Sequence, residues 1–366
     1  MLKGVKVIDF TNYLPGPFAT LRLAELGAEI IKVEPPEGDP ARYTGISKQG
    51  SGLVFLANNR QKKSITLNLK EESGVEMALK LIAHADVVIE SFRPGVMEKL
   101  GLGYVAVQKV KPDIVYCSIS GYGQQGLLSK LGNHDLNYMA LSGVLAQLKD
   151  KQGRPVHPSI TLADYLGGFA ANERILAGLV SRFLTGQGSY HSIAITDQLV
   201  SLLGNHVMVE NETGEGTGID ALNGSIISYA LYKTMDERYM SLGALEPKFW
   251  QNFCLAHGRE DWLRAHFSKT DESNPVYQEV TAIFKSKTFY EWIEFAQKVD
   301  CCMAPVLEIG ELQDNPYFKE KELIFASPWG DYQVKMHSDI EHTLITPPPH
   351  KGQNNDELLN KTRDSL

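Results

Sequence analysis

The sequence is poor in cysteine: its 366 residues include only four, and none of them forms a CxxC pair. Four scattered thiols predict reduced side chains rather than a disulfide framework. The chain also lacks an uninterrupted apolar run of about 18 residues, so we expect no membrane span and no membrane partner. The first residues, MLKGVKVIDF, lack the apolar stretch of a signal peptide, and the last three do not fit a peroxisomal address. We therefore expect a cytoplasmic protein.

An excess of basic charge is absent as well. The 36 lysines and arginines face 44 aspartates and glutamates, which gives a formal net charge of −8. A dedicated nucleic-acid binder needs a basic stripe for phosphates, and so we expect no nucleic-acid partner. A small anionic ligand is still compatible, because a local cluster such as Arg60, Lys62 and Lys63 can act within an acidic protein. Hydrophobic residues make up 43% of the chain and charged residues 22%, which excludes a mostly disordered protein.

The first third of the chain alternates short β-branched runs with helical patterns, which indicates a parallel, doubly wound sheet. The G-x-G-x-x-G fingerprint of dinucleotide binding is missing after the first run, where Pro15-Gly16-Pro17 stands instead. The sequence thus predicts a Rossmann-like sheet that does not bind NAD. The expected strands are residues 5–10, 29–33, 86–90 and 113–118, and the expected helices are residues 18–26 and 73–84.

Changes of composition divide the rest of the chain. Residues 133–208 have mostly helical spacing, and the polar, glycine-rich segment 210–218 is the best linker candidate. Short strands are expected at 229–232 and 239–243, with amphipathic helices around Trp250, Trp262, Ile283 and Trp292. We predict an α/β protein with a large Rossmann-like domain at residues 1–210, to which residues 320–366 return, and a smaller α+β domain at residues 224–312.

A histidine beside an acid opens one of the helical stretches. In one interpretation Asn133 or Asp135 caps the helix, and His134 is a partly exposed neighbour. In the other, His134 is a general acid or base, because histidine titrates near neutral pH.

Two further carboxylates have a structural and a chemical interpretation each. Asp164 lies in a run with few polar groups, so it is either a helix N-cap or a partly desolvated carboxylate with a raised pKa. Gly167-Gly168 beside it would let a ligand or another backbone approach closely. Glu246 precedes a proline that suits the first turn of a helix, where a glutamate meets the helix dipole. Tyr229 is compatible with an ordinary core aromatic, and these residues alone name no reaction.

Several stretches, taken in order, resemble the class III (family III) CoA-transferase superfamily, and within it the 2-methylacyl-CoA racemases. The resemblance implies a Rossmann-like large domain, a small domain, and two subunits interlocked like chain links as a homodimer. It implies an acyl-CoA substrate, with CoA as part of the substrate and no separate cofactor or metal. The matching stretches are VIDF (7–10) with PGP (15–17), LGAEIIKVE (26–34), NRQKKSI (59–65), SFRPGVMEKLG (91–101) and SGYG (120–123).

The resemblance also implies roles for single residues. The superfamily's catalytic aspartate matches Asp164. The racemases' His-Asp-x-Asn-Tyr motif matches residues 134–138, their Gly-Ala-x-Glu-Pro motif places its glutamate at Glu246, and their tyrosine matches Tyr229. This combination favours the racemase branch. For CoA itself we expect contacts from Lys32, Arg60, Lys63, Arg93 and Tyr138.

The chemistry of a racemase explains why such residues are needed. Inverting a carbon α to a thioester requires one group to remove a proton from one face and another to return a proton to the other. We expect neutral His134 to take the proton from the S face and protonated Asp164 to deliver one opposite. A backbone N–H near Asp135 would donate to the enolate oxygen. Glu246 would orient His134, and Tyr229 would line the acyl pocket.

Two other functions remain open at this point. Asp164 could be the nucleophile of a CoA-transferase that acts on an acceptor carboxylate, or the chain could be a non-catalytic acyl-CoA-binding protein. Relatives often carry an arginine where this sequence has Pro35, so Lys32, Arg42 or Arg60 would have to compensate. Two further departures are Ser192, where an aspartate is usual, and Asn354, where the tail motif has a histidine.

Overall fold

The computed structural model describes residues 1–150, 152–339 and 345–363. The chain forms two compact units. The large unit consists of residues 1–202 and 317–366, and the small unit of residues 203–316. The predicted domain limits along the chain were 1–210 with 320–366, and 224–312.

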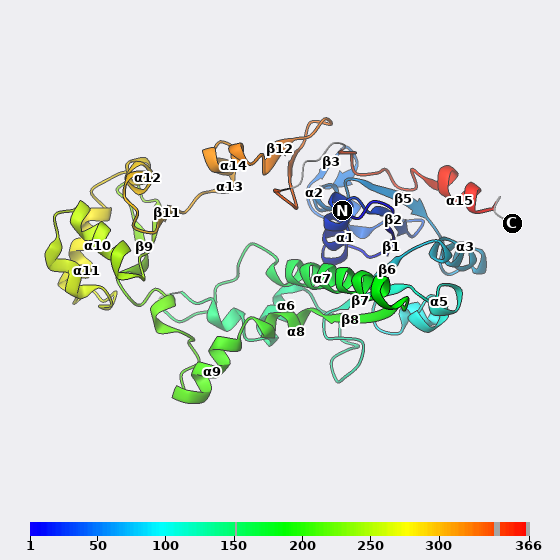
Figure 1. The fold of residues 1–366 in the computed structure, drawn as a ribbon, viewed down its shortest axis with the longest axis horizontal. Helices are drawn as coiled ribbons and strands as arrows, with labels where there is room; N and C mark the ends of the chain where they lie inside the picture. The colour runs from blue at the N-terminus through cyan, green and yellow to red at the C-terminus, as the bar shows by residue number, and fades with distance from the viewer. Residues whose placement is uncertain (151, 340–344, 364–366) are drawn as a thin grey trace. The chain divides into compact units, whose positions relative to one another are not determined.

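A six-stranded parallel sheet forms the centre of the large unit (Figure 1). Its order is β5-β2-β1-β6-β7-β8, which is the 3-2-1-4-5-6 order of a Rossmann sheet when these strands are counted along the chain. The order reverses between β1 and β6, and this is the switch point of the sheet. The strands are β1 (Lys6–Phe10), β2 (Glu29–Glu34), β5 (Lys62–Thr66), β6 (Val87–Glu90), β7 (Val115–Ser120) and β8 (Ser189–Ala194).

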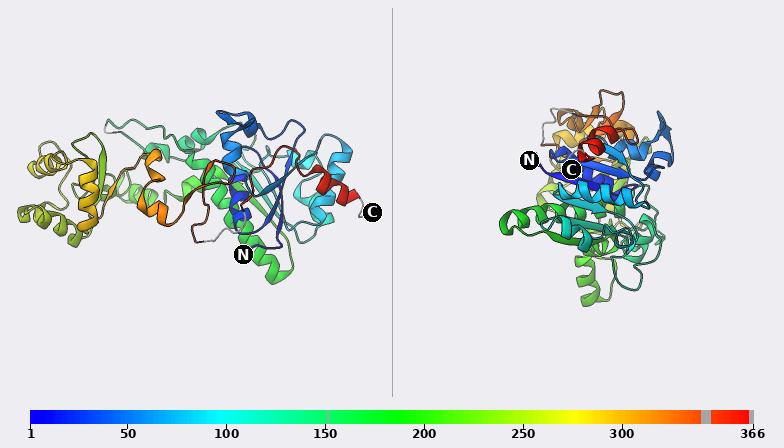
Figure 2. Two further views of the ribbon diagram at one scale, coloured as in Figure 1. Left: turned by 90° about the horizontal axis from the view of Figure 1, so that it is seen from above. Right: turned by 90° about the vertical axis from the view of Figure 1, so that its right-hand side faces the viewer.

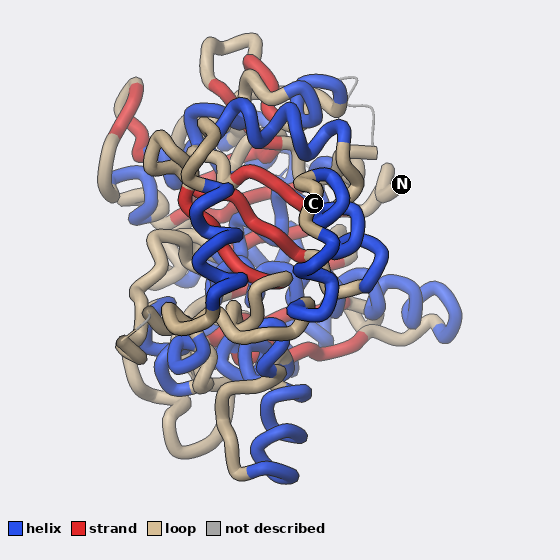
Figure 3. Tube along the Cα trace, turned by 90° about the vertical axis from the view of Figure 1, so that its left-hand side faces the viewer, coloured by secondary structure: helices blue, strands red, loops and turns tan. Residues whose placement is uncertain are grey.

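Helices cover both faces of this sheet (Figure 3). Alternate strand residues point to opposite faces, so Val7 packs toward α1 (Pro15–Glu25) and α7 (Leu162–Thr185), while Ile8 packs toward α3 (Glu72–Ala83) and α5 (Tyr104–Val110). Burying each such side chain stabilises the fold by about 1.5–3 kcal/mol. The C-terminal helix α15 (Asn355–Arg363) packs beside α3 (Figure 2).

Gly168 allows α7 to pack closely on α1. A Cβ added there would lie 2.7 Å from the backbone oxygen of Pro15, and one added at Gly167 would lie 2.8 Å from Cγ1 of Ile195. The space beside Gly167 and Gly168 is therefore occupied by other parts of the protein rather than left open for a ligand.

The predicted strands and helices of the first third are confirmed to within a few residues. Two predictions for the following stretch were wrong. Strand β8 lies in a region predicted as mostly helical, because its sequence SYHSIA is short and half polar. The predicted linker at 210–218 begins inside helix α9 (Gly204–Thr213), which ends only where Gly214 adopts a φ of 73°.

The small unit contains an antiparallel sheet in the order β11-β10-β9 and a core rich in tryptophan. Trp250, Trp262 and Trp292 are fully buried, as the apolar spacing of the expected helices requires. The segment around Trp262 is a 3-10 helix, η4 (Glu260–Ala265). Its other elements include β9 (Tyr229–Lys233), β10 (Tyr239–Gly243), α10 (Pro247–Ala256), α11 (Pro275–Phe284), α12 (Phe289–Lys298) and β11 (Met303–Pro305).

None of the helices in the described part of the chain combines the length and apolar character that a bilayer crossing needs.

The elements not yet named are short. The remaining elements are η1 (Pro40–Tyr43), β3 (Ser47–Lys48), β4 (Ser51–Gly52), α2 (Leu53–Asn58), α4 (Val96–Lys99), α6 (Asp135–Leu141), η2 (Leu145–Gln147), α8 (Ile195–Ser201), η3 (Asp220–Leu222), α13 (Ile309–Leu312), α14 (Pro316–Glu320), β12 (Ile324–Ala326) and β13 (Tyr332–Val334).

Candidate active site

A cavity of about 620 Å³ opens at the carboxyl ends of β1, β6 and β7. In open α/β sheets, ligands bind outside the carboxyl ends of the strands at the switch point, and this cavity occupies that place. Asn12 and Tyr13 line it after β1, Ser91 after β6, and Ser120 at the end of β7. The starts of α6 and α7 complete the wall with His134, Asn137, Tyr138 and Asp164.

Asp164 is a partly desolvated carboxyl group on the wall of this cavity. Burial raises the pKa of Asp164 to about 7, and the negative charge of Asp135 adds to the rise. Asp164 lies in the first turn of α7, where the helix dipole favours the ionised form, but burial outweighs that effect. The N-cap of α7 is Thr161, so the structure excludes the N-cap interpretation of Asp164.

His134 occupies the N-cap position of α6, with its side chain at the cavity. Its backbone N–H donates to Oδ1 of Asn137 at 3.0 Å. The capping prediction was wrong about the residues involved, because Asp135 accepts the backbone N–H of Asp164 at 3.1 Å instead. This bond ties the start of α6 to the start of α7, and so holds the two candidate proton-transfer residues on neighbouring helix ends.

Tyr138 is buried in α6, near enough to Asp164 and Asp135 to feel their charges, and its ring lies against Gly121 directly after β7. It is 7% exposed, and burial together with the charges of Asp164 and Asp135 raises the pKa of its phenol. The phenol therefore keeps its proton at neutral pH. Gly121 is needed beneath the ring, because a Cβ there would come within 2.3 Å of Cε1 of Tyr138.

Arg93 provides positive charge at the cavity. It is exposed, and within the described residues no carboxylate pairs with its guanidinium group. The loop that carries it is fixed by Glu90, which accepts the backbone N–H of Phe92 at 2.8 Å. Arg93 is thus available to an anionic ligand.

The other three cations expected to contact CoA, which are Lys32, Arg60 and Lys63, form ion pairs with carboxylates of the protein. Lys32 is 0% exposed, and its Nζ lies 2.8 Å from Oδ2 of Asp39. Arg60 is 1% exposed and pairs with Glu25. Drawing either charge toward a ligand would leave a buried carboxylate unpaired, which is strongly unfavourable.

Lys63 and Arg42 are also committed elsewhere. Lys63 pairs with Glu29 at 2.9 Å and with Glu357 at 2.7 Å, away from the cavity. Arg42 donates to both oxygens of Glu34 at 2.7 Å, so it does not compensate for Pro35 either. Local sequence does not show the pairings of Lys63, because Glu29 and Glu357 come from distant segments.

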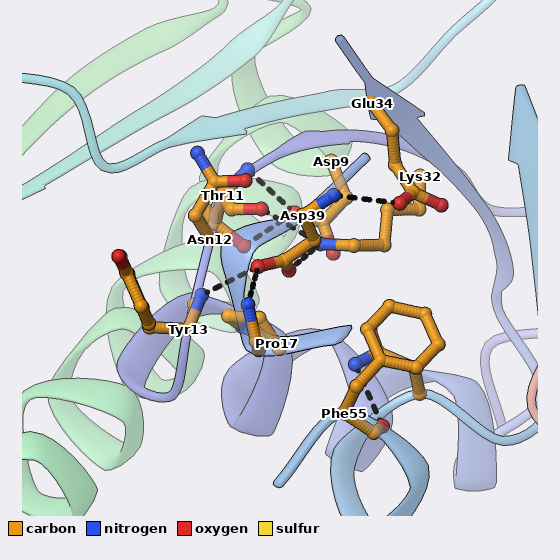
Figure 4. A network of polar contacts seen from close by, with 12 residues as sticks. Asp9, Thr11, Asn12, Tyr13, Pro17, Lys32, Glu34, Asp39 and Phe55 are labelled. Carbon is orange, nitrogen blue, oxygen red and sulfur yellow. Dashed lines mark hydrogen bonds and ion pairs between the residues drawn. The ribbon is translucent and has the colours of Figure 1, made fainter. Parts of the chain in front are cut away.

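The buried charges instead fix the loop that follows β1 (Figure 4). Lys32 donates to the backbone oxygen of Thr11 at 2.7 Å, and Asp39 accepts the backbone N–H of Tyr13 at 3.2 Å. Lys62 donates to the backbone oxygen of Pro17 at 2.9 Å, and burial lowers its pKa to about 7. This network holds one wall of the cavity in place.

Glu34 stands where Rossmann enzymes place the acid that binds the ribose of NAD. Its two oxygens already accept from Arg42, from the hydroxyl of Ser64 at 2.6 Å and from the backbone N–H of Asp39 at 2.9 Å. All the hydrogen bonds of this carboxylate that the structure shows are therefore made within the protein.

Sequence reasoning gave no role to Ser120. Its hydroxyl oxygen is buried at the end of β7 and has no hydrogen-bond partner among the described residues. An unpaired buried hydroxyl costs about 1–3 kcal/mol, which a ligand oxygen in the cavity would relieve. The signal in the sequence was a serine followed by glycine directly after a buried strand.

Glu246 and Tyr229 belong to the small unit. Glu246 is exposed at the N-cap of α10 with Pro247 at the first helical position, as the sequence predicted. Tyr229 begins β9 opposite Gly243, and its Cε2 lies 3.7 Å from the point where a Gly243 Cβ would be. Within the described residues, no three His, Cys, Asp or Glu side chains gather into a group that could hold a metal ion.

Residues 2–355 match the model of the CoA-transferase family III. The chain belongs to this family. It is therefore an enzyme of the superfamily that contains the family III CoA-transferases and racemases, as the motifs indicated.

Relatives in the family carry out both kinds of reaction. The chain is 30% identical to the alpha-methylacyl-CoA racemase of Homo sapiens over 366 residues, covering 98% of this chain and 92% of the racemase. It is 38% identical to the succinyl-CoA:glutarate CoA-transferase of Homo sapiens over 257 residues, covering 69% of this chain and 58% of the transferase. The crystal structure of a CAIB/BAIF family protein from Brucella suis has a TM-score of 0.85 at 25% identity and covers 98% of both chains.

The raised pKa of Asp164 has a cost in stability that can be measured. An unfolded aspartate titrates near pH 3.9, so between about pH 4 and pH 7 only the folded state holds this proton, and stability falls as pH rises. Asp164→Asn removes this cost. The variant should be more stable than the wild type by about 1–4 kcal/mol at pH 8, with little difference near pH 4.

Urea unfolding at pH 4.5 and at pH 8 measures this difference. Asp356→Asn, which changes an exposed aspartate of the same unit, is the control and should show no growth of the difference with pH. A stability gain for Asp164→Asn that is the same at both pH values would contradict the raised pKa.

Proposed function

We propose that this enzyme epimerises 2-methylacyl-CoA thioesters by proton transfer at the α-carbon. One observation carries the proposal: a carboxyl group with a pKa of about 7 shares a cavity with a histidine at the switch point of the sheet. A group that titrates near neutral pH can be an acid in one direction and a base in the other.

In the proposed reaction, neutral His134 takes the α-proton from the S face and becomes an imidazolium. The electron pair of the broken C–H bond moves into the thioester as an enolate. Protonated Asp164 then delivers its proton to the opposite face of the α-carbon, and the enolate returns to a thioester. A forward turnover thus moves one proton onto His134 and one off Asp164, and proton exchange with solvent returns both groups to their starting states. In the reverse direction the two groups exchange roles.

The enolate oxygen needs hydrogen-bond donors. The backbone N–H of Asp135 belongs to the first residue of α6, which has no carbonyl one turn earlier within the helix to donate to. We assign it, with the unpartnered hydroxyl of Ser120, to the enolate oxygen. Arg93 and Tyr138, which also line the cavity, are proposed to hold the CoA part of the substrate.

CoA transfer is the second candidate function, and the transferases among the relatives favour it. Ionised Asp164 would attack the acyl-CoA carbonyl and release CoA as a thiolate, which gives an anhydride. The thiolate would next attack the aspartyl carbonyl of this anhydride, which releases the donor carboxylate and leaves an aspartyl-CoA thioester. The acceptor carboxylate would displace the CoA thiolate to form a second anhydride, and attack of the thiolate on the acceptor's carbonyl would give the new acyl-CoA and free Asp164. A non-catalytic acyl-CoA-binding protein would do neither.

Chemical trapping of an acylated Asp164 distinguishes the racemase from the CoA-transferase. The enzyme is incubated with acyl-CoA, an acceptor carboxylate and hydroxylamine, and Asp164 is then examined by peptide mass spectrometry. Racemisation leaves Asp164 unmodified and moves no CoA to the acceptor. A hydroxamate on Asp164 together with a new acyl-CoA would establish the transferase instead.

We also propose that the enzyme is a homodimer, in the cytoplasm, whose two active sites each use both chains. Glu246 of one chain would lie roughly 2.6–3.2 Å from His134 of the other, or be joined to it through one water. Support comes from the exposed apolar face of α7, where Val180, Phe183 and Leu184 are 59%, 88% and 74% exposed. Such a face is typical of a surface that a second chain covers.

Complementation tests the shared site. His134→Ala and Glu246→Ala homodimers should each be impaired, and refolding the two variants together should restore one intact site per heterodimer. The mixture should therefore recover a substantial part of the activity. No recovery, or an active monomer in sedimentation at low concentration, would contradict the shared site.

A further inference from the structure

The buried pairings of Lys32, Arg42 and Arg60 leave open which cation meets the phosphates of CoA beyond Arg93. Lys351 is exposed, and its Nζ donates to the backbone oxygen of Pro36 at 2.7 Å. Within the described residues no carboxylate pairs with it. A lysine ammonium has three donors, so two remain for a ligand.

We propose that Lys351 binds a phosphate group of CoA at the carboxyl ends of β2 and β5. The inference rests on the proposed function only in that the chain must bind a CoA thioester.

The C-terminal segment holds Lys351 in a fixed place. Before it, the backbone oxygen of Pro349 accepts from Nη2 of Arg42 at 3.1 Å. After it, the backbone N–H of Gly352 donates to the hydroxyl of Ser64 at 2.9 Å. Ordering a loop ahead of binding lowers the entropy that a ligand contact costs.

Two asparagines extend this attachment along β5. Oδ1 of Asn354 accepts the backbone N–H of Ser64 at 3.0 Å, and Oδ1 of Asn355 accepts that of Thr66 at 2.9 Å. Asn354, the departure from the usual tail histidine, therefore has a structural role in docking the segment. Because β5 is an edge strand, these side chains satisfy groups that no neighbouring strand reaches.

A chain of contacts through Gly38 and Asp39 links Lys351 to the loop that borders the cavity. Tyr13 lines the cavity and donates its backbone N–H to Asp39. Gly38 precedes Asp39, and Cδ of Lys351 lies 3.0 Å from the point where a Gly38 Cβ would be. A ligand that extends from the cavity along the strand ends toward β2 would therefore reach the Lys351 ammonium group.

Binding titrations with three probes test the assignment: CoA, 3′-dephospho-CoA and pantetheine. Lys351→Ala should weaken CoA binding by about tenfold at low ionic strength, and salt should reduce the difference. Lys351→Arg should keep most of the affinity. Lys3→Ala changes an exposed lysine that precedes β1, at the amino ends of the strands rather than the carboxyl ends, and should have no effect.

The probes also identify the phosphate. A loss confined to CoA assigns Lys351 to the 3′-phosphate, and a loss for CoA and 3′-dephospho-CoA but not pantetheine assigns it to the diphosphate. Equal binding of all three probes to Lys351→Ala and wild type overturns this inference and leaves the proposed function standing. Failure of the wild type to bind CoA overturns both.

Discussion

Asp164→Asn removes turnover while CoA affinity stays within a few-fold of wild type. The amide keeps the volume of the carboxyl group but can neither deliver a proton nor attack a carbonyl. Because Asp164 lines the cavity and is partly buried, the substitution removes chemistry without opening a gap. Turnover of an enantiopure 2-methylacyl-CoA and CoA titration of the same preparation provide the two measurements.

Both enzymatic functions share this result, so it tests the site rather than the reaction. Asp356→Asn should retain full activity, and the stability of Asp164→Asn at pH 8 shows that the variant is folded. Activity above roughly a tenth of wild type would remove Asp164 from the chemistry.

His134→Ala distinguishes the two reactions, and we expect the α-proton exchange rate to fall by roughly 10²–10⁴. The expected loss is that of a general acid or base, because the variant still has Asp164 but nothing to take the proton from the S face. In a CoA-transferase centred on Asp164 the same change should matter far less. Exchange is followed by mass spectrometry of the acyl-CoA in deuterated solvent.

His84→Ala is the matched control, since His84 is exposed at the end of α3 on the other face of the sheet. Its exchange rate should equal that of wild type. Normal exchange in His134→Ala would end the racemase proposal even if the variant binds acyl-CoA well.

The sheet could be predicted from the sequence where its strands are continuous apolar runs. Val7 is buried on one face of the sheet, and Ile8 and Val88 are buried on the other. Strands that are buried on both faces are continuous apolar runs, which are easily recognised in a sequence. Strand β8 could not be predicted in this way, because it is an edge strand in which Tyr190 and His191 interrupt the apolar pattern.

The sequence indicated that Asp164 is a desolvated acid of the site. It did not indicate which lysines and arginines would be paired with carboxylates elsewhere in the protein. An acid in an apolar run predicts desolvation, and the raised pKa of Asp164 agrees with that interpretation. A lysine or arginine carries no local sign of whether it will be buried and paired. Arg60 pairs with Glu25, and Lys63 with Glu357, through contacts that exist only once distant segments have come together.

The most direct test of the proposed function is incubation of enantiopure (S)-2-methylacyl-CoA with the enzyme in D2O, followed for both deuterium uptake and loss of chirality. Proton transfer between two faces predicts one deuterium at the α-carbon of the inverted product, and a drift to an equal mixture of epimers without any acceptor carboxylate. If the substrate kept both its α-proton and its configuration under conditions in which the enzyme binds it, the proposed epimerisation would be contradicted.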